Sequence, residues 1–143
     1  MANKRNRRAG FTIIELVVVA VIIALLGSLV VPNIVRRFGK AKQSIAQAKL
    51  KVVEGALIEF KIDCGRFPAD SEGLEALLVA PSDLEGKWDG PYLKEKQLLD
   101  PWDNPILYVA DGSVNPGSFD LISYGADGQP EGEGENKDIY NDQ

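Results

Sequence analysis

One segment constrains the fold of this chain more than any other: residues 11–31, FTIIELVVVAVIIALLGSLVV, carry a single charge, that of Glu15. A helix of about 20 apolar residues spans the hydrocarbon core of a bilayer. A cleaved secretory signal has a shorter apolar stretch with small residues at its cleavage site, whereas Gly27-Ser28 is followed here by more leucine and valine. We therefore expect residues 11–33 to form a retained membrane helix.

The charges before this segment predict its orientation. Residues 1–10 contain no acidic side chain and four basic ones, Lys4, Arg5, Arg7 and Arg8. Basic residues next to a membrane helix favour the cytoplasmic side. We expect a single-pass protein with a cytoplasmic N-terminus, whose chain beyond residue 33 lies outside the cytoplasm.

Glu15 lies near the start of the apolar segment, where inserting a carboxylate costs free energy. Its position leaves two interpretations open. Either the carboxylate has a specific polar partner, or it reaches the lipid headgroups at the membrane surface.

The pattern after the apolar segment predicts a second half of the same long helix over residues 34–63. Gly27 and Pro32 make residues 27–33 its weak point, because proline removes a backbone hydrogen bond and crowds the preceding turn. Gly65 and Pro68 indicate where the helix ends. Apolar residues recur three and four positions apart, as in a helix that packs on the protein's own core; they are Ile45, Ala48, Val52, Val53, Ala56, Leu57 and Phe60.

Residues 64–143 are expected to form a small head. A short helix over residues 71–78, capped by Asp70 or Ser71, should precede a loop over residues 81–105. Residues 106–110 and 119–123 are typical of strands and are joined by a turn that starts at Asp111-Gly112. The predicted fold class is α+β, with a long N-terminal helix packed on a small antiparallel sheet.

The composition excludes several functions. The chain has no histidine and one cysteine, Cys64, so the Ser-His and Cys-His nucleophile pairs and any internal disulfide are absent. The sequence contains neither of the Gly-rich phosphate-binding motifs G-x-x-x-x-G-K-[ST] and G-x-G-x-x-G. The net charge of −5 disfavours binding to nucleic acid. We expect a protein that is not an enzyme.

The residues around the start of the apolar segment carry a resemblance. Gly10-Phe11-Thr12-x-x-Glu15, after a basic leader, resembles the type IV prepilin signal. The resemblance implies that residues 1–10 are a leader, that a prepilin peptidase cuts between Gly10 and Phe11, and that Phe11 is then N-methylated. It also implies that Glu15 pairs with the N-terminal amine of a neighbouring subunit in a filament.

A second series of motifs narrows the resemblance to the major pseudopilins of the type II secretion system, the general secretion pathway protein G family. The motifs are Gly65-Arg66-Phe67-Pro68, Gly73-Leu74-x-Ala76-Leu77, Trp88-Asp89-Gly90-Pro91-Tyr92-Leu93, Asp100-Pro101-Trp102-x-Asn104-Pro105 and Ser123-Tyr124-Gly125-Ala126-Asp127-Gly128. The resemblance implies a type IV pilin-like subunit that is extracted from the inner membrane into a homopolymeric periplasmic pseudopilus and drives protein secretion across the outer membrane. An adhesive or motility pilin is the alternative.

The same resemblance implies a set of partners. They are minor pseudopilins, the prepilin peptidase, an inner-membrane assembly platform, a secretion ATPase and membrane lipid. An ATPase is needed because this chain has no nucleotide-binding motif of its own.

The acidic C-terminal segment is the last chemical feature. From Asp127 onward it holds six acidic residues and one lysine. Oxygen donors in a Gly-rich loop suit Ca²⁺, but a solvated acidic tail would have the same composition. The resemblance implies one Ca²⁺ bound by the side chains of Asp127 and Asp138 and the carbonyl of Tyr124, with Glu135 or Asn136 as a further ligand.

Overall fold

The computed structural model describes residues 10–142, and for residues 29–37 it describes the helical backbone alone. Residues 1–9 of the expected leader lie outside the described residues. The chain divides into two compact units, residues 1–35 and residues 36–143. Helix α1 (Ile13–Cys64) begins in the first unit and ends in the second, so the expected long helix is confirmed and runs through Pro32 without interruption.

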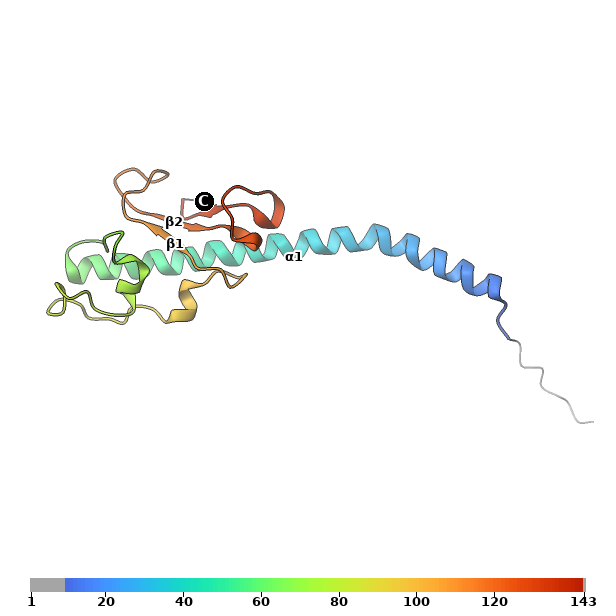
Figure 1. Ribbon diagram of the computed structural model, residues 1–143, viewed down its shortest axis with the longest axis horizontal. Coiled ribbons are helices and arrows are strands. Elements are labelled where there is room, and N and C mark those ends of the chain that lie inside the picture. The colour runs from blue at the N-terminus through green and yellow to red at the C-terminus, as the bar shows by residue number, and fades with distance from the viewer. Residues whose placement is uncertain (1–9, 143) are drawn as a thin grey trace, which may run out of the picture. The chain divides into compact units, whose positions relative to one another are not determined.

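Three short strands form the sheet of the second unit, in the order β1-β2-β3. Strand β1 (Leu107–Val109) pairs antiparallel with β2 (Asp120–Ser123), and β2 pairs antiparallel with β3 (Ile139–Tyr140). The first two strands lie where the sequence predicts them, whereas β3 was not located by its sequence. The sheet lies along the C-terminal half of α1 (Figure 1).

Four 3₁₀-helices connect these elements: η1 (Gly73–Leu77), η2 (Glu95–Leu98), η3 (Gly125–Asp127) and η4 (Gly134–Asn136). The helix expected over residues 71–78 is therefore one short 3₁₀ segment, and its N-cap residue is Glu72, without a side-chain cap. The predicted cap was wrong, because Asp70 instead accepts a hydrogen bond from the backbone N–H of Ala110 at 2.7 Å.

The core forms between one face of α1, the segment around η1 and the inner side of the sheet. On α1 the buried side chains are spaced three or four residues apart; they are Ala46, Leu50, Val53, Ala56, Leu57, Phe60 and Cys64. Leu74, Leu77, Phe119 and Leu121 pack against them. This face accounts for the packing of residues 36–143 as one unit.

The prediction that a single apolar stripe packs on the core was wrong in part. Ile45, Ala48 and Val52 are exposed in the described structure. At 3.6 residues per turn, the seven residues of the expected stripe cover too wide an arc for one contact face. Helix α1 therefore has two neighbouring apolar faces, of which the fold buries one.

Candidate functional site

The expected processing site lies just before α1. Gly10, Phe11 and Thr12 are not helical, and both Gly10 and Phe11 are exposed. Helix α1 starts at Ile13. The Gly10–Phe11 peptide bond is thus in an open segment, which is the state in which a protease can bind an extended substrate.

Thr12 and Glu15 form a reciprocal cap at the start of α1. The N–H of Thr12 donates to the Glu15 carboxylate at 3.3 Å, and the N–H of Glu15 donates to the Thr12 hydroxyl at 3.2 Å. This is a capping box, which satisfies backbone donors that have no partner inside the helix. This capping role of Glu15 was not predicted from the sequence, although the spacing Thr-x-x-Glu before an apolar run is its signal.

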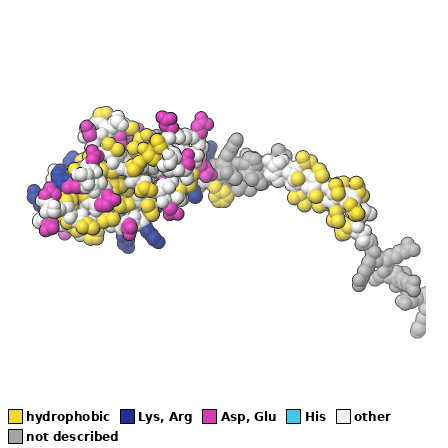
Figure 2. Space-filling model, viewed as in Figure 1, with side chains coloured by type: hydrophobic (Ala, Val, Ile, Leu, Met, Phe, Trp, Pro, Cys, Tyr) yellow, Lys and Arg dark blue, Asp and Glu magenta, His cyan; other side chains and the backbone are white. Residues whose placement is uncertain are grey.

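The first half of α1 exposes its apolar side chains in the single chain. Ile13 is 83% exposed, and further exposed apolar side chains follow it along the helix from Ile14 to Leu26. Figure 2 shows these side chains covering the start of α1. An apolar surface of this extent needs a cover from lipid or protein.

Among the described residues, no helix combines the length and the apolar character required to cross a membrane. The structure thus does not confirm the membrane helix expected over residues 11–33.

The expected calcium loop folds as two limbs that touch through their backbones. Gly125 has φ +70°, and a Cβ atom there would lie 2.6 Å from the carbonyl oxygen of Glu135 and 2.8 Å from the carbonyl carbon of Asn136. Only glycine fits such an approach at this backbone angle. The limb that carries Tyr124 and Asp127 is thereby held against the limb that carries Glu135 and Asn136.

Two further contacts close this loop. The N–H of Glu131 donates to one carboxylate oxygen of Asp138 at 3.1 Å. The amide of Gln43, on α1, donates to the carbonyl of Gly134. The acidic loop is therefore folded onto the head and is not an extended tail.

The other carboxylate oxygen of Asp138, Oδ1, is buried and has no hydrogen-bond partner. A buried carboxylate oxygen without a partner is costly unless a cation or a donor satisfies it. Within residues 10–142, no group of three or more His, Cys, Asp or Glu side chains is placed to hold a metal ion. Asp138 thus fits a calcium site, and the site would depend on backbone and amide oxygens beside the carboxylates.

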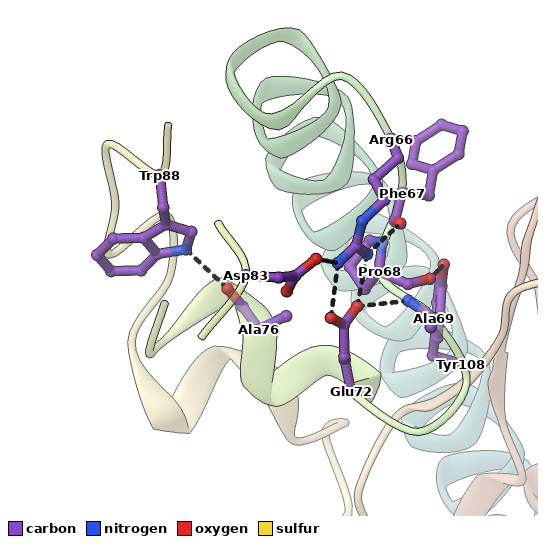
Figure 3. A network of polar contacts seen from close by, with 9 residues as sticks. All are labelled: Arg66, Phe67, Pro68, Ala69, Glu72, Ala76, Asp83, Trp88 and Tyr108. Carbon is purple, nitrogen blue, oxygen red and sulfur yellow. Dashed lines mark hydrogen bonds and ion pairs between the residues drawn. The ribbon is translucent and has the colours of Figure 1, made fainter. Parts of the chain in front are cut away.

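A separate ion-pair network holds the segment after α1. Arg66 donates to both carboxylate oxygens of Glu72, at 2.6 and 2.7 Å, and to Asp83 at 2.9 Å (Figure 3). Glu72 also accepts the N–H of Ala69 at 2.7 Å. The hydrogen bonds from Arg66 hold the pKa of Glu72 below its usual value. This network is structural and lies outside the two candidate sites.

The lowered pKa of Glu72 predicts a pH dependence of stability. Its stabilising charge is fully present above the pKa of a free glutamate, about 4.3, and is lost as the pH falls through the lower pKa of the folded state. We expect Glu72→Gln to cost about 1 kcal/mol at pH 7 and to reduce the loss of stability between pH 6 and pH 3. Thermal melts of both proteins at these pH values test this. Parallel pH curves would contradict it.

The fold and the N-terminal site together define the class of the protein. A long helix that starts within a Gly-Phe-Thr-x-x-Glu motif, with a small antiparallel sheet along its second half, is the architecture of type IV pilin-like proteins. Two family models match the chain: "Prokaryotic N-terminal methylation motif" over residues 5–31 and "Type II secretion system (T2SS), protein G" over residues 33–142.

Known relatives agree with these matches. The type II secretion system core protein G of Pseudomonas aeruginosa is 39% identical, with coverage of 96% of this chain and 97% of the relative. That of Vibrio cholerae is 39% identical, with coverage of 97% and 94%. The crystal structure of the major pseudopilin from enterohaemorrhagic Escherichia coli superposes with a TM-score of 0.62 at 29% identity, over 78% of this chain and 96% of that one. The chain belongs to the type II secretion system protein G family.

Proposed function

We propose that this chain is the structural subunit of a periplasmic pseudopilus, which polymerises through α1 and drives the secretion of folded proteins across the outer membrane. The observation that carries the proposal is the exposed apolar start of α1, which lies within the residues matched by the N-terminal methylation motif. Before assembly this surface is covered by inner-membrane lipid, and in the filament by neighbouring subunits. The similarity to core protein G supports this function over that of an adhesive or motility pilin.

The second half of α1 adds a surface for neighbouring subunits. Exposed residues recur there at alternating intervals of three and four, which is the spacing with which helices pack against helices. They are Phe38, Ala41, Ile45, Ala48, Val52, Gly55, Glu59 and Ile62. Small residues at Ala41, Ala48 and Gly55 allow a close approach. We assign this stripe to contacts between subunits.

The remaining parts of the proposal concern partners. The prepilin peptidase cuts after Gly10 and methylates Phe11, an inner-membrane platform and a secretion ATPase extract the mature subunit, and minor pseudopilins share its filament. The head then lies in the periplasm and the N-terminus starts in the cytoplasm. Bound Ca²⁺ holds the C-terminal loop closed, with Asp127, Asp138 and the carbonyl of Tyr124 as ligands and Glu135 or Asn136 beside them. The ion supplies positive charge that offsets the mutual repulsion of these acidic groups.

Deleting the gene for this protein in its native host tests the main proposal. We expect proteins destined for export to accumulate in the periplasm, and expression of the full-length chain to restore their release. Loss of surface pili or of motility with normal secretion would contradict the proposal and support the pilin alternative.

Processing gives a separate prediction. In a host with a prepilin peptidase, the intact mass of the mature protein should match a chain that begins at Phe11 and carries one added methyl group. Gly10→Leu should remain at full length. The matched control Gly27→Leu should be processed normally, since Gly27-Ser28 is the position at which an ordinary signal peptide would end. A mature protein cut near Ser28 would overturn the assignment.

A further inference from the structure

Asn104 holds the first limb of the C-terminal loop although it lies outside the loop in the sequence. Its side-chain amide donates to the carbonyl oxygen of Gly125 at 2.8 Å. A Cβ atom at Gly128, where φ is +64°, would lie 3.2 Å from the amide oxygen of Asn104. The turn from Gly125 to Gly128, which contains η3 and Asp127, therefore wraps around this one side chain.

Asp100 fixes Asn104 in turn. Asp100 is 2% exposed. One of its carboxylate oxygens accepts the N–H groups of Trp102 and Asn104, both at 2.9 Å. Its other oxygen accepts the hydroxyl of Ser123, at the end of β2, at 2.6 Å. Lys49 on α1 also donates to the carbonyl of Leu99 at 2.6 Å, so the Asp100 turn is tied both to the helix and to the sheet.

These contacts determine where the two limbs of the loop meet. The backbone of Gly125 lies directly against that of Glu135 and Asn136. The expected ligands of the first limb lie close to Gly125 in the sequence: Tyr124 precedes it directly and Asp127 follows it by two residues. Fixing the carbonyl of Gly125 therefore fixes the first limb relative to the second.

We propose that Asn104, held by Asp100, is a positioning residue for cation binding by the C-terminal loop. It contributes no ligand. It keeps the oxygens of the first limb in place before the cation arrives, so that less ordering is required on binding. The inference rests on the proposed calcium site. It adds that the affinity of that site depends on a side chain twenty residues before the first expected ligand, Tyr124.

Calorimetric titration of the full-length chain in detergent with CaCl₂ tests this, together with thermal melts in EGTA. Hydrogen-bonded groups that support metal ligands typically contribute 10–100-fold in affinity. We expect Asn104→Ala to raise the Kd for Ca²⁺ by about this factor. Asn104→Asp keeps the size of the side chain but cannot donate to Gly125. It should also weaken binding, even though its added negative charge by itself favours a cation.

The matched control is Asn115→Ala. Asn115 donates to Asp120 at 2.9 Å and to Asn141 at 3.1 Å, at the other end of β2. We expect this variant to lower the melting temperature in EGTA and to leave the Kd unchanged. If Asn104→Ala lowers the melting temperature but binds Ca²⁺ with the same Kd as the wild type, the role of Asn104 is structural and the proposal is wrong. If the wild-type chain binds no Ca²⁺, the calcium site itself is wrong, and the positioning role is overturned with it.

Discussion

Replacing Glu15 with valine should abolish filament assembly while leaving cleavage after Gly10 intact. The resemblance to the prepilin signal implies that the carboxylate of Glu15 pairs with the N-terminal amine of Phe11 on a neighbouring subunit of the proposed filament. Valine leaves that amine without a partner in an apolar bundle of helices, and breaking a buried ion pair from one side costs about 3–5 kcal/mol. The loss recurs at every subunit. Filament yield by electron microscopy and intact mass for processing measure the two effects.

The capping box provides the matched control for this variant. Thr12→Ala removes the hydroxyl that accepts the N–H of Glu15 but keeps the carboxylate, so it should cost only the ~1 kcal/mol of a lost helix cap. We expect Thr12→Ala to assemble at a yield close to wild type. An equal defect in both variants would show that Glu15 acts by capping its own helix and not by pairing between subunits. Normal filaments from Glu15→Val would show that assembly depends neither on pairing between subunits nor on the helix cap.

Removing calcium should produce the second large effect. An ion present at a hundredfold excess over its Kd stabilises the folded state by about 2.7 kcal/mol, which corresponds to roughly 10 °C in the melting temperature of a head of this size. Adding EGTA should lower the melting temperature by this amount and expose the C-terminal loop to proteases. Mg²⁺ should not restore the melting temperature, because this ion prefers a smaller octahedral shell and retains its waters.

Two variants separate a bound ion from general charge effects. Asp127→Asn should abolish the stabilisation by Ca²⁺. Glu133→Gln removes the same charge from an exposed position in the same loop. This variant should keep the stabilisation by Ca²⁺. If sodium chloride at equal ionic strength raises the melting temperature as much as CaCl₂ does, the acidic loop is only screened and the calcium assignment is wrong.

The features that the sequence predicted well are those encoded in neighbouring residues. The Gly10-Phe11 motif, the apolar run and the helical periodicity indicated a long helix and its family before any contact was known. The strands β1 and β2 were located because each is a short apolar run bounded by turn residues. Strand β3, of two residues, has too few positions to show an alternating pattern, and it exists because β2 offers it a partner.

Contacts between distant residues were decided only by the tertiary structure. Periodicity shows that a helix face is apolar but not what covers it, so Ile45 and Val52 were assigned to a core that Leu50 and Val53 occupy. Likewise, an aspartate before a short helix can cap it or bond elsewhere, and Asp70 bonds Ala110 because β1 brings that N–H within reach. The contact of Asn104 with Gly125 joins residues 21 apart. This contact depends on the packing of the turn after η2 against the end of β2, and no local propensity specifies that packing.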